Sequence, residues 1–193
     1  AAGSLDAAGL MARCPALETL TIDARHAHGA TAERIAAYAA GSGQLSVTID
    51  ARRAAPHLAA AVVRTVAELR PRGVAAIHAR TRLMGGAAEA EALLESGAEV
   101  ISVDMVADTA ETYVRLAGVD AVATVREGLE YLVKNSPTGE CGLPERWIVP
   151  RITRRDGVYG EIERFYDRWL LTAGACVIDP LEAAVAGERI GTL

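Results

Sequence analysis

Residues 98–133 read AEVISVDMVADTAETYVRLAGVDAVATVREGLEYLV, and this stretch decides the fold that the sequence predicts. Its first part, 99–105, is rich in β-branched residues and suits a buried strand. Ser102 and Asp104 stand two apart near the end of that strand and therefore share one face. Apolar residues then recur at three- and four-residue spacing over 122–132, which predicts an amphipathic helix. The stretch is a βα unit with polar groups at the carboxyl end of its strand, where α/β folds place their sites.

A recurrence of strands with similar endings extends this pattern along the chain. The pentapeptide TIDAR occurs at 21–25 and again at 48–52, so its aspartates are 27 residues apart. Asp104 follows Asp50 by twice this interval. A strand with its loop and helix occupies about this length in a βα unit. The recurrence predicts six parallel strands, near 17–23, 45–50, 74–79, 99–104, 147–153 and 175–179.

Helical patterns fill the intervals between these strands. They cover 31–40, 56–69, 87–96, 122–132 and 160–171. In the last of these, Phe165, Tyr166 and Trp169 stand at helical spacing, which predicts that they pack in the core. Strict alternation of strands and helices implies a parallel sheet with right-handed crossovers. No G-x-G-x-x-G follows the first strand, which counts against a doubly wound dinucleotide-binding fold. The predicted fold class is α/β, a partial (β/α)6 TIM-like barrel with parallel strands in sequence order. It is predicted to form one domain over 1–193 with a long loop at 135–145.

Composition narrows the class of protein. A hydrophobic fraction of 51% is enough for a sizeable core, and a net charge of −5 argues against a nucleic-acid-binding surface. No apolar run is long enough to cross a bilayer, and the first residues lack the pattern of a signal peptide. Cys14, Cys141 and Cys176 are odd in number and far apart, so they indicate neither a disulfide framework nor a C-x-x-C site. These features predict a reduced, cytoplasmic protein.

Polar residues end most of the predicted strands. In a barrel such ends converge on one rim, where ligand-binding and catalytic groups lie. For any single residue, a role in ending a strand or capping a helix is the alternative explanation. Taken together, the residues favour a ligand pocket, although none can be assigned a catalytic role. The predicted ligand-binding set is Asp50, Arg80, Ser102, Asp104, Arg151, Thr153 and Asp179.

The fourth βα unit also resembles a known family. The order Ser102, Asp104, an acidic turn, Tyr113, Gly118 and an apolar helix is similar to the fourth unit of radical S-adenosylmethionine (radical SAM) enzymes. The resemblance extends over roughly 73–181, and before that it rests on the strand count alone. It implies a six-stranded partial barrel whose carboxyl rim binds the adenosyl ligand. The turn after the second strand departs from the family, because IDARRAAPHL replaces its Gly-Gly-Glu-Pro pattern and keeps only a later proline.

The cluster-binding motif of that family is missing. A Cys-x-x-x-Cys-x-x-Cys loop should follow the first strand, but the chain reads ARHAHGATAE there. The chain alone is therefore expected to bind no iron–sulfur cluster. Cluster and S-adenosylmethionine would be cofactors only if the cysteine loop lies elsewhere. Two explanations stay open: a cluster-less relative with a ligand-binding or scaffold role, or part of a larger radical SAM modification enzyme, with that enzyme's other domains as partners.

Two further classes of function stay open as alternatives. His26 and His28 form a His-x-His pair after the first strand, where metal-dependent hydrolase barrels place two ligands. Such a hydrolase would need His78 together with Asp104 or Asp179 to complete its metal site. A non-enzymatic interaction module is the other alternative. Arg154 and its neighbours after the fifth strand could hold a carboxylate or a phosphate through paired donors.

Overall fold

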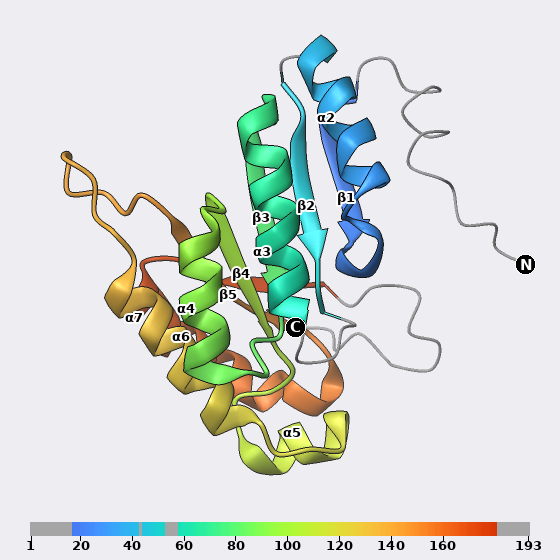
Figure 1. Cartoon of the computed structure of the whole chain (residues 1–193). Coiled ribbons are helices and arrows are strands. Elements are labelled where there is room, and N and C mark those ends of the chain that lie inside the picture. The colour runs from blue at the N-terminus through green and yellow to red at the C-terminus, as the bar shows by residue number, and fades with distance from the viewer. Residues whose placement is uncertain (1–16, 43, 53–57, 181–193) are drawn as a thin grey trace, which may run out of the picture. The chain divides into compact units, whose positions relative to one another are not determined.

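Six parallel strands alternate with helices in the computed structural model, which describes residues 17–42, 44–52 and 58–180 (Figure 1). Neighbouring strands follow one another in the order β1-β2-β3-β4-β5-β6, with β1 and β6 at the two ends. This order confirms the predicted α/β class with parallel strands in sequence order, because a doubly wound sheet would reverse direction. The strands are β1 (Thr19–Asp23), β2 (Ser46–Asp50), β3 (Ala76–Thr81), β4 (Val100–Met105), β5 (Trp147–Thr153) and β6 (Val177–Asp179).

The helices between the strands agree with the predicted ranges, with one addition. The additional helix is α5, which begins after Thr109 and ends at Gly118 in the left-handed conformation, with φ +73°. The Thr109 hydroxyl accepts the N–H of Thr112 at 3.3 Å and caps the helix. The helices are α2 (Ala30–Ser42), α3 (Leu58–Leu69), α4 (Gly86–Ser96), α5 (Ala110–Ala117), α6 (Val122–Asn135) and α7 (Ile162–Ala173), with 3-10 turns η1 (Ala24–His26), η2 (Arg70–Arg72) and η3 (Asp156–Glu161). Among the residues described, none of these helices combines the length and apolar character that a membrane span requires.

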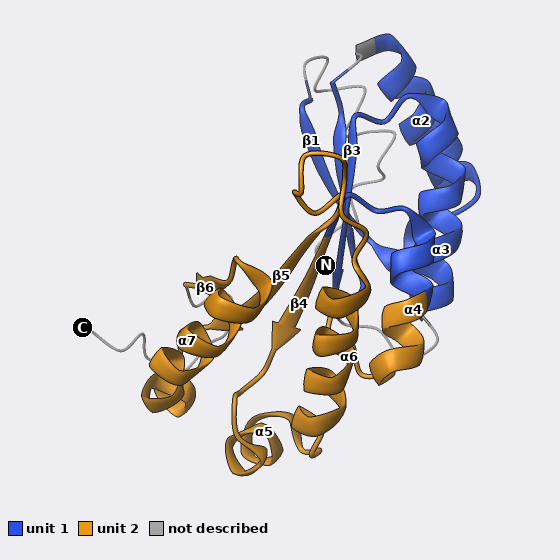
Figure 2. Ribbon diagram, turned by 90° about the vertical axis from the view of Figure 1, so that its left-hand side faces the viewer, with its two compact units in different colours: residues 1–80, 92–100 blue, residues 81–91, 101–193 orange. Residues whose placement is uncertain are grey.

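The chain divides into two compact units (Figure 2). Unit 1 holds residues 1–80 and 92–100, and unit 2 holds residues 81–91 and 101–193. The prediction of one domain over the whole chain stays a prediction.

Unit 1 is built on β1 and β2, whose buried residues match in register. Leu20 pairs with Val47 and Ile22 with Ile49, and all four are buried. Helices α2 and α3 lie beside these strands and contact each other (Figure 2). Their apolar residues bury against the sheet because they recur at helical spacing on one face. On the opposite face of β1 and β2, the residues that alternate with the buried ones are polar.

Unit 2 is built on β5, β6 and the helix α7 that packs on β5. Ile148, Pro150 and Ile152 are buried on the face of β5 that α7 covers, while the residues between them point the opposite way. Phe165 and Trp169 of α7 are both essentially inaccessible, as core packing predicts. Tyr166, which the same helical spacing assigned to the core, is 42% exposed instead, because it lies on the side of α7 that β5 does not cover.

The predicted surface loop at 135–145 is a hydrogen-bonded turn. Gly139 N donates to Leu143 O at 2.8 Å, and Glu145 N donates to Pro137 O at 2.8 Å. Leu143 is 63% exposed at its tip. The backbone hydrogen bonds explain why a loop of this length is ordered.

Candidate functional site

An ion-paired triad lies at the carboxyl ends of β4, β5 and β6 in unit 2. The Arg151 guanidinium contacts Asp179 through two parallel bonds, Nε to Oδ2 at 2.9 Å and Nη2 to Oδ1 at 2.5 Å. Its Nε also lies 3.7 Å from Asp104 Oδ1. The three side chains are 15–19% exposed. Three of the seven predicted ligand-binding residues therefore meet at one place.

Strand register accounts for this convergence. Arg151 pairs with Val177 and Thr153 with Asp179, so residues of this parity on β5 and β6 share one face. Arg154 N donates to Asp179 O at 2.8 Å and holds the end of β6 against β5. Thr153 thus lies beside the triad on the same face. The paired donors of Arg151 then orient the Asp179 carboxylate, because a bidentate contact fixes both distance and plane.

Ser102 lies one row deeper along β4 than Asp104. The two residues share a face of the strand, but Ser102 is fully buried whereas Asp104 is partly exposed. A ligand at the surface of the triad would reach Asp104 first. A direct contact between Ser102 and a ligand stays a prediction.

The two remaining predicted residues belong to unit 1. Asp50 ends β2 and lies in register with Asp23 of β1 and with Arg80 of β3. One row deeper, Thr48 Oγ1 and His78 Nδ1 form a hydrogen bond of 3.2 Å. Unit 1 therefore has its own row of charged strand ends. That Asp50 and Arg80 share a cavity with the triad of unit 2 stays a prediction.

Each copy of the TIDAR sequence folds into the same local structure. Asp50 Oδ1 accepts Arg52 N and Arg52 Nε, both at 3.0 Å, and Asp50 Oδ2 accepts Arg52 Nη2 at 2.7 Å. Asp23 receives the same three donors from Arg25. Burial raises the pKa of Asp50, but the hydrogen bonds from Arg52 outweigh it and the net shift is downward. Hydrogen bonding from Arg25 lowers the pKa of Asp23 to about 2. Both carboxylates are held in the charged form by their own neighbours.

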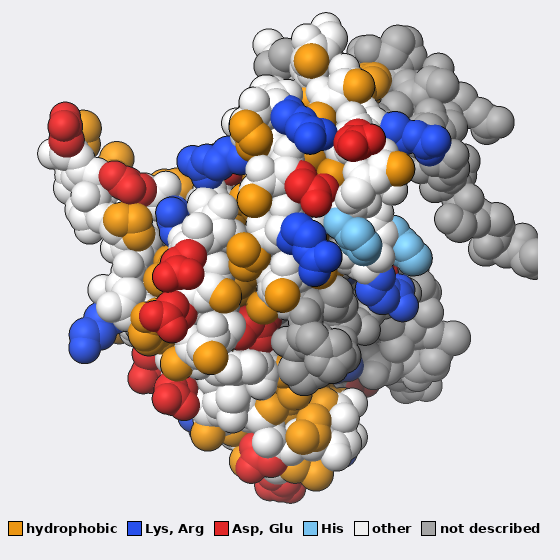
Figure 3. All heavy atoms as spheres, in the orientation of Figure 1, with side chains coloured by type: hydrophobic (Ala, Val, Ile, Leu, Met, Phe, Trp, Pro, Cys, Tyr) orange, Lys and Arg blue, Asp and Glu red, His pale blue; other side chains and the backbone are white. Residues whose placement is uncertain are grey.

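The histidine pair after β1 has no third metal ligand placed beside it among the residues that the structure describes. His26 and His28 are exposed, and Figure 3 shows histidine side chains at the surface. Among residues 17–42, 44–52 and 58–180, no group of three His, Cys, Asp or Glu side chains is placed to hold a metal ion. A catalytic zinc site needs about three protein ligands. The hydrolase alternative therefore gains no support from the described part of the chain.

The cysteines do not fit the cluster that the family resemblance implies. The segment after β1 is the 3-10 turn η1, which contains no cysteine. Cys141 is exposed in the 135–145 turn, and Cys176 lies just before β6, where burial raises the pKa of its thiol. Cys14 lies outside the described residues. A cluster of this family needs three thiolates from one short loop, and the given sequence contains no such loop.

A second charged cluster, which the sequence reasoning missed, lies around Asp108 in the segment between β4 and α5. The Asp108 side chain is fully buried and contacts Arg126 Nη2 at 2.9 Å. Arg164 Nε and Arg168 Nη2 of α7 approach its Oδ2 at 3.3 and 3.8 Å. Arg126 also donates to the Asp108 carbonyl. The sequence shows only that Arg164 and Arg168 are four residues apart, which places them on one face of a helix. It does not show that Asp108 is the residue they contact.

Glu161 also interacts with the segment between β4 and α5. Its carboxylate accepts Asp108 N at 2.6 Å, Thr109 N at 3.1 Å and Thr109 Oγ1 at 2.5 Å. Burial raises the pKa of Glu161, but these hydrogen bonds to the charged form outweigh it, so the net shift is downward. The segment that follows Asp104 is therefore fixed to the start of α7, which gives the rim of unit 2 a rigid support.

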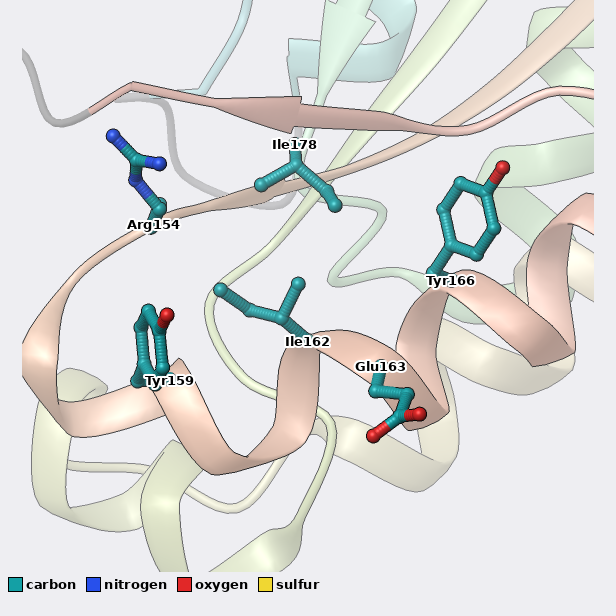
Figure 4. A pocket seen from close by; sticks show the side chains of 6 residues that line it. All are labelled: Arg154, Tyr159, Ile162, Glu163, Tyr166 and Ile178. Carbon is teal, nitrogen blue, oxygen red and sulfur yellow. The ribbon is translucent and has the colours of Figure 1, made fainter. Parts of the chain in front are cut away.

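A cavity of about 400 Å³ opens between α7 and β6 on the face opposite the triad (Figure 4). Of its lining residues only Arg154 was singled out by the sequence. Tyr166 was assigned to the core, and Ile178 belongs to a strand too short to show its exposed face. The lining residues are Arg154, Tyr159, Ile162, Glu163, Tyr166 and Ile178.

Compared with models of protein families and with curated proteins, the sequence matches none of them.

Proposed function

We propose that this chain is a radical SAM-like domain that binds an adenosyl ligand at the carboxyl ends of β4, β5 and β6. It acts either as a cluster-less relative or as part of a larger radical SAM modification enzyme whose cysteines lie elsewhere. The observation that carries the proposal is the triad of Asp104, Arg151 and Asp179. The choice of family rests on the order Ser102, Asp104, Tyr113 and Gly118, which resembles the fourth βα unit of radical SAM enzymes.

Charge supports a ligand of this class. One guanidinium between two carboxylates leaves one net negative charge at the triad when both acids are ionised. S-adenosylmethionine carries a sulfonium and an ammonium against one carboxylate, so its net charge is positive at neutral pH. Opposite charges at a partly desolvated surface attract more strongly than in bulk water. The triad therefore favours this ligand over adenosine phosphates.

Hydrogen bonding supports it as well. A ribose diol offers two adjacent hydroxyl donors, and a carboxylate accepts two such bonds. Arg151 Nε lies 3.7 Å from Asp104 Oδ1, so the Asp104 carboxylate is restrained before a ligand binds and less freedom is lost on binding. We assign Asp104 to the hydroxyl donors of the ligand and Arg151 to the positioning of both carboxylates.

Calorimetric titration of the purified chain tests the proposal. S-adenosylmethionine and S-adenosylhomocysteine share the adenosyl group but differ by the sulfonium charge, so the first should bind more tightly. We expect saturable binding that Asp104→Asn weakens about tenfold, which corresponds to about 1.4 kcal/mol. Glu33→Gln, at an exposed acid of α2 in unit 1, is the matched control for loss of a negative charge and should bind like the wild type. Absence of saturable binding at millimolar ligand, or equal loss in the control, would refute the proposal.

A further inference from the structure

Strand β6 presents one edge without a strand partner. It is the last strand in the sheet order, and within the described residues it pairs only with β5. Its middle residue, Ile178, is 39% exposed and points into the cavity beside α7 (Figure 4). A strand edge that has no neighbouring strand can pair with another extended segment. The cavity and the edge therefore form one continuous groove, which we call the β6 groove.

The β6 groove has an apolar centre. Ile162 and Ile178 point toward each other across it, and Tyr159 and Tyr166 stand at its two ends (Figure 4). The two tyrosines are 37% and 42% exposed. A volume of about 400 Å³ admits one large apolar side chain or two small ones. An aliphatic side chain buried there would have its apolar surface removed from water, which favours binding.

One end of the groove carries a guanidinium whose Nε donor is unpaired among the described residues. Arg154 lies at the carboxyl end of β6, and its Nε is buried without a hydrogen-bond partner among the described residues. A buried donor left unpaired is energetically unfavourable, so a group that accepts its hydrogen bond is favoured there. A carboxylate is the natural partner, because it accepts a charge-assisted bond from a guanidinium. The groove is thus apolar in the middle and selects an anion at this end.

We propose that the β6 groove binds an extended peptide segment of a partner protein, added to the sheet parallel to β6. The segment places an aliphatic side chain between Ile162 and Ile178 and a carboxylate on Arg154. Parallel addition continues the direction of all six strands and brings the carboxyl-terminal end of the segment to Arg154. The carboxylate is either the peptide's own terminus or an acidic side chain. This binding is independent of the adenosyl ligand, which is assigned to the opposite face of β5 and β6.

The test uses a library of random heptapeptides displayed with free carboxyl termini and selected on the wild-type chain. We expect enriched peptides with aliphatic residues at alternate positions. The consensus is then synthesised with a free acid, with a terminal amide and with its acidic side chains neutralised, and binding is measured by fluorescence polarisation. Whichever carboxylate is used, removing it should weaken binding about tenfold, and Arg154→Gln should abolish that difference.

Two substitutions and two controls complete the test. Ile178→Glu should abolish binding, and Tyr166→Ser should weaken it if Ile178→Glu fails to fold. Leu171→Glu changes an 86% exposed residue of the same helix outside the groove and should have no effect. Arg72→Gln is the control for loss of a positive charge. Each variant is checked by circular dichroism and thermal melting.

Four results would overturn the proposal. The first is no enrichment, and the second is binding that survives both groove substitutions. The third is tighter binding by a chain ending at Pro180, which would assign the groove to residues 181–193 of the chain itself. The fourth is a concentration-dependent dimer that Ile178→Glu abolishes, which would assign it to a second copy. Loss of adenosyl binding leaves this proposal standing, because the two sites lie on opposite faces.

Discussion

The carboxylate of Glu161 accepts the backbone N–H of Asp108 at 2.6 Å, although 53 residues separate the two in sequence. The same carboxylate binds both the N–H and the hydroxyl of Thr109. It therefore replaces water as the acceptor for the donors at the start of α5. Because Glu161 immediately precedes α7, its carboxylate connects the start of α5 to the start of α7 in unit 2.

Glu161→Gln should destabilise the chain by about 2 to 4 kcal/mol, because charge-assisted bonds are lost and an amide NH₂ faces backbone donors. Urea unfolding followed by circular dichroism measures the change. The pH dependence adds a second readout. Because the folded-state pKa of Glu161 lies below its ordinary value of 4.5, its contribution is full above that value and is lost as pH falls through the folded pKa. The wild type should therefore lose more stability than the variant between pH 5 and pH 3. Parallel curves for the two proteins would contradict this account.

Asp108→Asn should lower the free energy of unfolding by at least as much as Glu161→Gln. The substitution leaves arginines 126, 164 and 168 facing a neutral side chain in a buried place, and removing one partner of a buried ionic network costs about 3 to 5 kcal/mol. Arg164→Gln is the matched comparison, since Arg164 is 54% exposed and an exposed pair contributes under about 1 kcal/mol. Thermal and urea unfolding of both variants give the two values. Equal losses would mean that Asp108 is not the centre of the network.

Gly128→Ala should destabilise α6 although alanine favours helices. A Cβ at this position would lie 2.6 Å from Leu83 Cδ2 and 3.0 Å from the Gly86 carbonyl oxygen. Leu83 cannot move away easily, because it is fully buried and holds a backbone φ of +54°. Overpacking of this kind costs about 1 to 3 kcal/mol. Gly41→Ala in α2 is the control: nothing lies within 4 Å of its Cβ, so it should stabilise the chain by up to about 1 kcal/mol.

The Asp23 carboxyl should titrate near pH 2 in the folded chain. Hydrogen bonds from the Arg25 side chain favour the charged form, and its contribution to stability is lost only as pH falls toward that value. Carbon-detected NMR titration measures the midpoint directly. In Arg25→Gln the midpoint should return toward the ordinary value of 3.8. A midpoint unchanged by that substitution would show that Arg25 is not the cause of the shift.

Local pattern was enough to predict the strands and most of the helices. The 3.6-residue apolar period depends on residues close in sequence, and the helix ranges agree with it. The 27-residue recurrence is visible along the sequence itself, and the strand order agrees with it. The TIDAR segments likewise fold through contacts between residues two apart. Helix α5 was missed because its eight residues are too few to display a clear period.

The sequence by itself therefore determined the α/β alternation and placed Asp104, Arg151 and Asp179 at strand ends. Tertiary structure alone decided which of these ends meet, because Arg151 and Asp179 are 28 residues apart and are joined by strand register. It also decided that Asp108 is the partner of arginines on two helices, and that Tyr166 lines a cavity while Phe165 and Trp169 fill the core. The physical reason is that periodicity marks a face of an element, whereas the partner of that face depends on packing between segments distant in sequence.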